Sequence, residues 1–394
     1  KRVFAVVLAC LLMFSLSACG SDGSGGSKNN GDTITIAYIG PLTGEGAAWG
    51  QPELNTIQMM VDKVNEEEGG ILGKKIILKS YDNRGDNVET TNAAKKAIQN
   101  DGACAIIGCN GSGATLALAS VCEEFKVPNI ATTATNSKVT IDDNGKVRPW
   151  TFRVILADPQ YGEIMADYAY NKMGIRKVGI LYEVSSDYSS GITQNFTSSF
   201  KKLGGTITAA EAYKQGDVDF RAQLAKLNQS NPEALFLPMT YKELGLATKQ
   251  ARSLGMQHKF LGPDCWMNND LFSVAGDAIE GSVFVAPIDG SDPALDEFKK
   301  WYREVNNNEE PDAAGSNAYF AYDAFVYLKA AIEKAGTADS AAIRDALEEV
   351  EKVEGLTGAI TMLKDSHNPI RSVNIFEVKK DHFESISNFI VEYK

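Results

Sequence analysis

The chain has 394 residues, which exceeds what one ordinary hydrophobic core supports, so we expect two domains. Apolar residues make up 44% of the chain and charged residues 23%, which is the composition of a soluble globular protein. The net charge of -12 argues against a polyanionic partner such as nucleic acid.

The first 32 residues have the pattern of a targeting segment rather than of a folded domain. A charged start precedes an apolar run that ends at Phe14 and is too short for a comfortable membrane span. The stretch LSAC that follows resembles a bacterial lipobox, which predicts removal of residues 1–18 as a signal peptide and lipidation of Cys19. An ordinary signal peptide with a chance cysteine is the alternative. Residues 19–32 are rich in Gly and Ser, as in a flexible tether. We therefore expect a Gram-positive lipoprotein on the extracytoplasmic face of the cell membrane, held there through lipid alone.

From Thr33 onward the chain alternates predicted strands with predicted helices. The helix after the first strand carries Ile57, Met60, Val61 and Val64 on one face, at the spacing of an amphipathic helix. A repeated strand–helix pattern indicates a parallel sheet with helices on both faces. The strands of this first set are predicted at residues 33–40, 75–81, 104–108 and 127–131.

The same pattern restarts near residue 151 and builds a second set of similar size. Its strands are predicted at residues 177–182, 206–213, 233–238 and 259–263. Three successive helices and three strand-like pieces close the chain, with the helices around Leu295–Val305, Ala318–Ala335 and Ala341–Val350. A tail of this kind does not build a third domain, so we expect it to cross back and complete the first two.

Two successive predicted strands end in glycines and small hydroxyl groups. The strand that stops at Gly108 leads into Ser112, and the next strand leads into Thr133 and Thr135. In open parallel sheets, ligands bind at the carboxyl ends of strands, where helix N-termini attract anions. These side chains therefore form a candidate cradle for one small carboxylate. Helix capping by Ser112 and turn formation by the threonines explain the same residues equally well.

No catalytic or metal-binding motif accompanies these residues, so we expect neither an enzyme nor a bound metal or cofactor. The stretch GCNGSG lacks the spacing of a dinucleotide-binding loop and has no P-loop lysine. Ser112 is not in a nucleophile elbow, because Asn110 and Ala114 stand where that motif needs glycine. The three histidines share no metal-ligand spacing, and we expect each of them on the surface: His258, His367 and His382.

Six stretches of the chain together resemble the receptors of branched-chain amino acid ABC importers. They are IAYIGPLTGEGAAWG, VNEEEGGILGKKI, YDNRGD, IIGCNGSGAT, VPNIATTATN and FLGPDCW, in this order. The resemblance covers Thr33–Lys394 and points to type I periplasmic binding proteins related to the leucine/isoleucine/valine-binding protein. It implies an α/β fold of two Rossmann-like lobes with parallel central sheets, joined by a three-segment hinge, which close on a ligand between them.

The resemblance also implies where one lobe ends and the other begins. The first lobe would comprise residues 33–154 and 284–358, and the second lobe residues 155–283 and 359–394. The chain would cross between the lobes near Arg153–Leu156, Gly281–Ala286 and Leu356–Ile360.

Carried over by motif, the family's amino-acid clamp implies binding residues in the first lobe. Ser112, next to Gly111, would bind the ligand carboxylate. The backbone carbonyl of Thr133 would bind the ammonium, and Thr135, next to Ala134, would serve both groups.

The second lobe would supply the counter-charge and aromatic contacts. Asp264, in the stretch FLGPDCW, would pair with the ammonium, although it is shorter than the glutamate of the family motif. Tyr188 falls on an aromatic position of the family. A further family tyrosine falls on Thr240, and we assign its role to the adjacent Tyr241.

The positions that would surround the ligand's side chain depart from the family pattern. Trp49 would add a large flat surface, and Asn110 and Asn317 would add donors and acceptors. A purely aliphatic ligand would leave both amides unpaired, at about 1–3 kcal/mol each. The sequence therefore favours an amino acid, either branched-chain or more polar or aromatic. Packing at the edge of the lobe for Trp49, and helix capping for Asn317, are the alternatives.

The resemblance implies a monomeric solute receptor that hands an amino acid to the permease subunits of an ABC importer. A sensor that works with a separate signalling partner is the alternative, because the same fold serves as an extracellular ligand-sensing domain.

Overall fold

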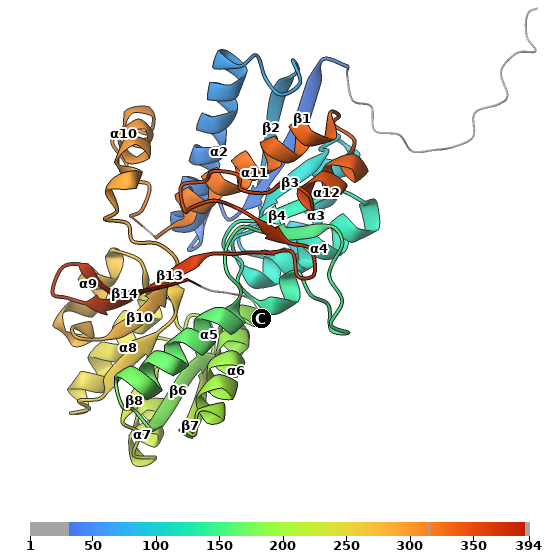
Figure 1. The fold of residues 1–394 in the computed structure, drawn as a ribbon. Helices are drawn as coiled ribbons and strands as arrows, with labels where there is room; N and C mark the ends of the chain where they lie inside the picture. Colours follow the sequence, from blue (N-terminus) through green and yellow to red (C-terminus); the bar gives the residue numbers. More distant parts are fainter. Residues whose placement is uncertain (1–30, 314, 391–394) are drawn as a thin grey trace, which may run out of the picture.

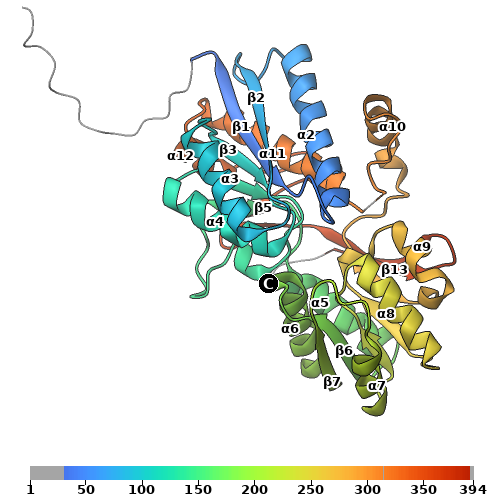
Figure 2. The same cartoon turned by 180° about the vertical axis from the view of Figure 1, so that it is seen from behind.

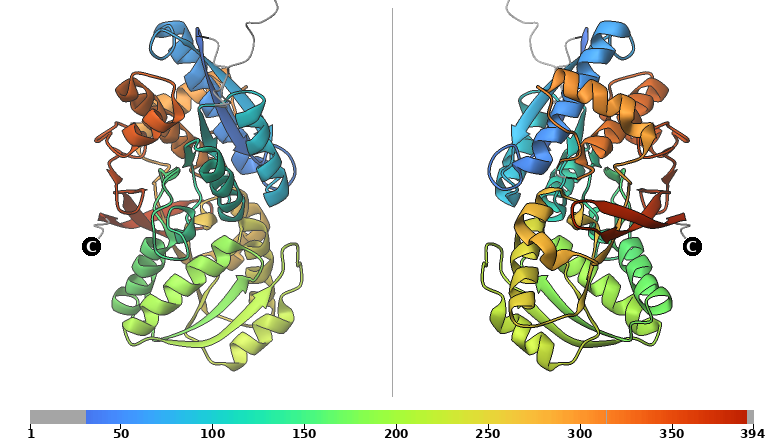
Figure 3. Two further views of the ribbon diagram at one scale, coloured as in Figure 1. Left: turned by 90° about the vertical axis from the view of Figure 1, so that its right-hand side faces the viewer. Right: turned by 90° about the vertical axis from the view of Figure 1, so that its left-hand side faces the viewer.

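The computed structural model describes residues 31–313 and 315–390. The expected signal peptide, the lipidation site at Cys19 and most of the expected tether therefore lie outside the described residues. Two α/β lobes lie one above the other in Figure 1, and Figures 2 and 3 show the same arrangement from behind and from the sides. Within the described part of the chain, no helix combines the length and the apolar character needed to cross a membrane.

The first lobe is built on a five-stranded parallel sheet in the order β2-β1-β3-β4-β5. The strands are β1 (Thr33–Gly40), β2 (Lys75–Asp82), β3 (Ala105–Gly108), β4 (Asn129–Ala131) and β5 (Thr151–Arg153). Its helices are α2 (Ala47–Glu67), α3 (Asn87–Gln99) and α4 (Ser112–Phe125), with α10 (Asp296–Val305), α11 (Asn317–Ala335) and α12 (Ser340–Leu347) from the tail. The tail thus completes the first lobe, as expected.

Alternation along β1 divides the core of the first lobe into two layers. Ile36 and Tyr38 pack in the same cluster as residues of α2 and α11, whereas Ala37 and Ile39 pack with residues of α3 and α4. Successive side chains of a strand point to opposite faces, so a sheet covered on both sides buries every position. Figures 1 and 2 show α2 and α11 on one side of this sheet and α3 and α4 on the other.

The second lobe has a seven-stranded sheet in the order β14-β13-β10-β9-β8-β6-β7. Its strands are β6 (Lys177–Glu183), β7 (Thr206–Tyr213), β8 (Ala234–Phe236), β9 (Lys259–Gly262), β10 (Val283–Ala286), β13 (Ser372–Val378) and β14 (Phe383–Ile390). β13 runs antiparallel to both of its neighbours, β10 and β14, and turns directly into β14. The helices of this lobe are α5 (Asp158–Asp167), α6 (Asp187–Lys202), α7 (Arg221–Gln229), α8 (Tyr241–Ser253) and α9 (Asp270–Ala275).

The second passage between the lobes lies later in the chain than expected. β10 occupies the predicted passage at Gly281–Ala286 and is hydrogen-bonded to β9 and β13 inside the second sheet. Its four residues are all buried, so the apolar stretch VFVA is held in the sheet and the chain leaves this lobe only after Ala286. The lobe boundaries themselves stay a prediction.

Arg371 ties two of the passages together at the hinge. Its buried guanidinium donates to the carbonyl oxygens of Val154 at 3.0 Å and Gly358 at 3.0 Å, and to Oδ2 of Asp323 at 2.9 Å. Close by, a small hairpin of β11 (Met362–Leu363) and β12 (Asn368–Pro369) lies beside β5. Arg371 thereby holds together the segments that contain Val154, Gly358 and Asp323, where the lobes meet.

His367 is a correction to the sequence analysis, which placed it on the surface. It is fully buried and stacks on Phe152 with ring centroids 4.0 Å apart. Its Nδ1 lies 3.0 Å from the carbonyl oxygen of Thr151, and its Nε2 lies 3.0 Å from Glu348. The hairpin beside β5 folds this polar ring inward, an arrangement that no local pattern signals.

Candidate ligand cleft

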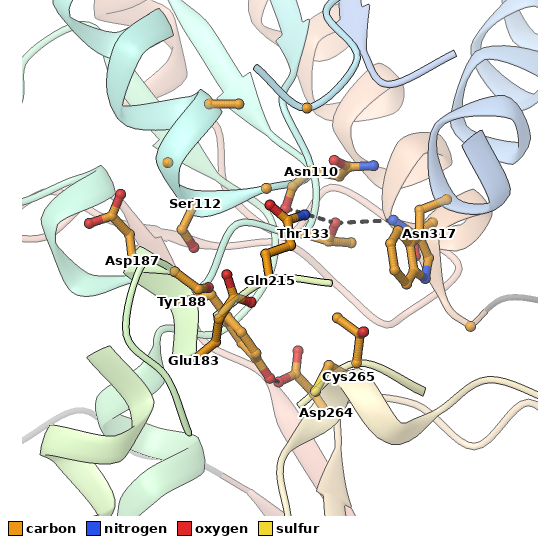
Figure 4. Close-up of a pocket in the computed structure, with 18 of the residues that line it drawn as sticks. Asn110, Ser112, Thr133, Glu183, Asp187, Tyr188, Gln215, Asp264, Cys265 and Asn317 are labelled. Atoms are coloured by element: carbon orange, nitrogen blue, oxygen red, sulfur yellow. Dashed lines mark hydrogen bonds between the residues drawn. The ribbon is translucent and has the colours of Figure 1, made fainter. Parts of the chain in front are cut away.

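A cleft of about 510 Å³ separates the two lobes at the carboxyl ends of their strands. This volume lies in the range typical of small-molecule sites. We call it the interlobe cleft, and Figure 4 shows most of its lining. The first lobe contributes Trp49, Gly85, Asp86, Asn87, Asn110, Gly111, Ser112, Gly113, Ala114, Thr133, Gly315, Ser316 and Asn317; the hinge contributes Ile155; the second lobe contributes Glu183, Ser185, Ser186, Asp187, Tyr188, Gln215, Thr240, Asp264, Cys265 and Met267.

The N-terminus of α4 opens into the first-lobe side of the cleft. The residue before the helix, Gly111, provides no side-chain cap, so the first backbone N–H groups of α4 have no capping side chain. Ser112 begins the helix, and its Oγ accepts a hydrogen bond from the backbone N–H of Asn136 at 3.2 Å. The hydroxyl proton of Ser112 is then available to an acceptor in the cleft. A helix N-terminus with a free hydroxyl group favours an anion.

Asp264 faces the cleft from the second lobe, at the end of β9. Its Oδ1 accepts a hydrogen bond from the hydroxyl of Tyr188 at 2.7 Å, and Figure 4 shows the ends of the two side chains next to each other. Burial raises the pKa of Asp264 to about 6, and the bond from Tyr188 opposes that shift. A half-buried carboxylate of this kind is stabilised in its ionised form by a cation.

The charged lining of the cleft is entirely acidic. Asp86, Glu183, Asp187 and Asp264 contribute carboxyl groups, and no lysine or arginine is among the described residues that line the cleft. Fixed negative charge around a small cavity favours a ligand that carries a positive group.

A chain of hydrogen bonds joins three residues on the remaining wall. Nδ2 of Asn317 donates to Oγ1 of Thr133 at 3.1 Å, and Oγ1 of Thr133 lies 3.4 Å from the backbone carbonyl oxygen of Asn110 (Figure 4). Thr133 and Asn317 converge on the carboxylate of Glu53, which lies on α2 directly behind the wall. Glu53 is fully buried, and burial raises its pKa to about 7.

The sequence analysis missed Glu53, although its position carries a signal. Glu53 lies four residues before Ile57, on the apolar face that continues through Met60, Val61 and Val64. A charged residue on the buried face of a helix is uncommon and generally has polar partners. The partners of Glu53 come from β1, from the loop after β4 and from the start of α11, so only the folded chain reveals them.

Eight of the eleven predicted ligand-binding residues line the cleft. They are Trp49, Asn110, Gly111, Ser112, Thr133, Tyr188, Asp264 and Asn317. Ala134 and Thr135 are fully buried behind the lining, and Thr240 stands in the lining where we had assigned Tyr241. The roles of all eleven stay predictions.

Two of the three residues outside the lining, Tyr241 and Thr135, contact groups that lie near it. The Tyr241 ring meets Trp49 edge to face, with centroids 6.1 Å apart, and so supports a lining residue from behind. The backbone oxygen of Thr135 accepts from the N–H of Asp158 at 2.7 Å. Burial raises the pKa of Asp158 to about 8, and the nearby Thr135 side chain opposes the shift.

The two lobes contact one another around the cleft. Nδ2 of Asn136 in the first lobe donates to the backbone oxygen of Asp187 in the second at 2.6 Å. Lys242 on α8 pairs with Glu45, before α2, at 3.5 Å. The two lobes therefore already touch at these two contacts, and a ligand in the cleft would lie between them.

The family described as periplasmic binding protein matches the sequence over residues 33–382. The chain is 30% identical to Leu/Ile/Val-binding protein homolog 3 of Brucella melitensis over 346 residues, which span 87% of this chain and 91% of that relative. It superposes with a TM-score of 0.80 and 28% identity on the branched-chain amino acid transporter substrate binding protein of Streptococcus pneumoniae in complex with isoleucine, covering 91% of this chain and 99% of that one.

A second solved structure shares the fold but holds a different kind of ligand. The solute binding protein of an ABC transporter from Rhodopseudomonas palustris BisB5, in complex with 3,4-dihydroxy benzoic acid, gives a TM-score of 0.79 and 25% identity over 91% of this chain and 98% of that one. These matches confirm the predicted fold and the predicted absence of an enzyme function. The chain belongs to the periplasmic binding protein family, whose members are extracytoplasmic solute receptors, and it is a homologue of the Leu/Ile/Val-binding proteins.

Proposed function

We propose that this protein binds a free α-amino acid in the interlobe cleft and delivers it to the permease subunits of an ABC importer. The opposition of Ser112 and Asp264 across one cleft carries the proposal. Ser112 and the uncapped N-terminus of α4 suit a carboxylate, and half-buried Asp264 suits an ammonium. A zwitterion matches both ends, and it bridges the lobes when it binds.

The acidic lining supports an amino acid over a simple carboxylic acid. An acid without an ammonium would satisfy the N-terminus of α4 but would leave Asp264 buried without a counter-charge. Truncating one partner of a buried charge pair typically costs about 2–5 kcal/mol, and a ligand that lacks the ammonium incurs a loss of that kind.

Calorimetric titration of the protein with each of the twenty amino acids tests this proposal. We expect at least one to bind, and we expect its α-amide and its N-acetyl derivative to fail, because each lacks one of the two charges. Tight binding of a carboxylic acid without an amino group, together with no binding of any amino acid, would overturn the proposal.

We further propose that the mature protein is a monomer that begins at lipidated Cys19. The stretch LSAC and the Gly/Ser-rich residues 19–32 support this. Mass spectrometry of the membrane fraction should find an N-terminal diacylglyceryl cysteine. An unmodified N-terminus elsewhere in the chain would contradict the anchor, and it would leave the proposed ligand unaffected.

A further inference from the structure

Glu53 organises the wall of the cleft that lies away from Asp264. Its Oε1 accepts from Oγ1 of Thr132 at 2.9 Å and from Nδ2 of Asn317 at 2.8 Å, and Oγ1 of Thr133 lies 3.5 Å away. Its Oε2 accepts from the hydroxyl of Tyr38 at 2.9 Å. These partners come from three separate segments and include no cation, so the carboxyl group acts as a shared acceptor.

This acceptor fixes the orientation of the Asn317 amide. Oε1 of Glu53 stays an acceptor whether the carboxyl group is ionised or carries its proton on Oε2, so the amide turns its nitrogen toward Glu53. The two N–H groups of Asn317 then serve Glu53 and Thr133. Among the described residues nothing donates to Oδ1 of Asn317, which leaves the wall with an unused acceptor in a residue that lines the cleft.

Asn110 supplies the complementary donor. Its Nδ2 is buried and has no hydrogen-bond partner in the described part of the chain. Asn110 also lines the cleft, and Thr133 connects it to Asn317. One wall thus contains an unused carbonyl acceptor and an unused N–H donor whose nitrogen lies just beneath the lining, and a buried polar group without a partner is costly.

We propose that this wall selects an amino acid whose side chain carries a hydroxyl or carboxamide group, and that Glu53 is the positioning residue that sets this selectivity through Asn317 and Thr133. A hydroxyl or a carboxamide both accepts and donates, so it can pair with Asn110 and Asn317 together. A hydrocarbon side chain of the same shape leaves both amides unpaired. The inference rests on the proposed amino-acid function and narrows it.

Calorimetry with isosteric pairs tests the side-chain preference in the wild-type protein. Threonine is compared with valine, and asparagine with leucine, beside a screen of all twenty amino acids. We expect the tightest ligand to carry a hydroxyl or carboxamide and to bind roughly tenfold or more tightly than its hydrocarbon isostere. A tightest ligand with any other side chain overturns this inference while amino-acid binding stands. If none of the twenty binds, the proposed function fails as well.

Three variants test the positioning role of Glu53. Asn317→Leu should reduce the preference for the polar member to about one- to threefold, or reverse it. Glu53→Leu should act in the same direction, because it removes the acceptor that orients Asn317. Glu53→Gln should keep the preference, because its side-chain oxygen still accepts from Asn317 and its nitrogen can donate to Tyr38. Glu66→Gln, an exposed change on the same helix, is the matched control.

The ratio of the two affinities separates positioning from a merely structural role. Loss of packing would weaken both members of a pair alike and leave the ratio unchanged. If Glu53→Leu does not fold, Asn317→Leu, at a half-buried position, decides the test. The positioning role is wrong if Asn317→Leu keeps the wild-type ratio of the two affinities. It is also wrong if Glu53→Gln loses that ratio.

Discussion

At the scale of single residues, Asp264 is where the proposed clamp depends most on charge. Asp264→Asn keeps the size of the side chain but removes the counter-charge for an ammonium, so affinity for the amino acid should fall about ten- to a thousandfold. Ser112→Ala should lower the affinity for the amino acid about ten- to a hundredfold. The loss is smaller than for Asp264→Asn because the backbone N–H groups of α4 still bind the carboxylate. Asp277→Asn, an exposed change in the same lobe, is the control for titration calorimetry. Near-wild-type affinity in Asp264→Asn would contradict the clamp.

The raised pKa of Asp264 also predicts the pH dependence of binding. The ammonium of a bound ligand stabilises the ionised carboxylate, so the pKa in the complex should lie below the value of about 6 in the free protein. Binding then releases a proton when the pH is below about 6. Affinity should therefore be full above pH 6 and should decline as the pH falls through that value. Asp264→Asn should lose this step, and a step of unchanged size would assign the titration to another group.

Glu53 should make the folded protein less stable as the pH rises through the weakly acidic range. Burial raises its pKa from 4.5 to about 7, so the folded protein keeps a proton that the unfolded chain releases. Stability is then lost between pH 4.5 and 7, by roughly 3 kcal/mol in all, and the loss is constant above pH 7.

Urea unfolding of wild type and Glu53→Gln from pH 4.5 to 8 isolates this effect. The stability of Glu53→Gln relative to wild type should rise between pH 4.5 and 7, because glutamine does not ionise. Glu66→Gln, an exposed change on the same helix, is the control. A stability difference for Glu53→Gln that does not change with pH would mean that Glu53 does not titrate in this range.

At the scale of elements, the contact between α5 and α6 depends on a glycine. A Cβ at Gly162 on α5 would lie 2.7 Å from the backbone nitrogen of Phe196 on α6 and 3.0 Å from the carbonyl carbon of Asn195. Backbone atoms inside a helix cannot yield locally, so Gly162→Ala should separate the helices and cost about 1–3 kcal/mol.

That cost should exceed the gain of about 1 kcal/mol in helix propensity that alanine brings. Urea unfolding should place the midpoint of Gly162→Ala below that of wild type. The neighbouring exposed change Glu163→Ala should stay within about 0.5 kcal/mol of wild type. A stabilised Gly162→Ala would show that α5 and α6 are free to move apart.

At the scale of the whole molecule, the ligand should act as the bridge between the lobes. A ligand that binds only the folded protein stabilises it by about 2.7 kcal/mol at a hundredfold excess over its Kd. The melting temperature should therefore rise by a few degrees with the cognate amino acid, and small-angle scattering should show a smaller or unchanged radius of gyration. Equal stabilisation by the N-acetyl derivative would contradict recognition of the ammonium.

The elements were largely readable from the sequence because their signals are local. The period-two pattern of β1 and the apolar face of α2 depend only on residues within each segment. The strand-end residues Ser112 and Thr133 could be placed near a cleft, because parallel strands direct their carboxyl ends to one edge of the sheet. The burial of His367 and the place of β10 inside the second sheet could not be anticipated, because each depends on a segment that returns from the distant tail.

The sequence by itself determined the two sets of strands and helices, the family resemblance and eight of the residues that line the cleft. Tertiary structure alone decided which of those residues share partners. Glu53 meets Thr132 and Asn317, which lie 79 and 264 positions away, and the backbone oxygen of Thr135 accepts from the N–H of Asp158 behind the lining. Local hydrophobic periodicity determines whether a segment forms a helix or a strand, because it depends only on residues a few positions apart. A buried carboxylate is tolerated only where distant donors converge on it, and that convergence exists only once the lobes are assembled.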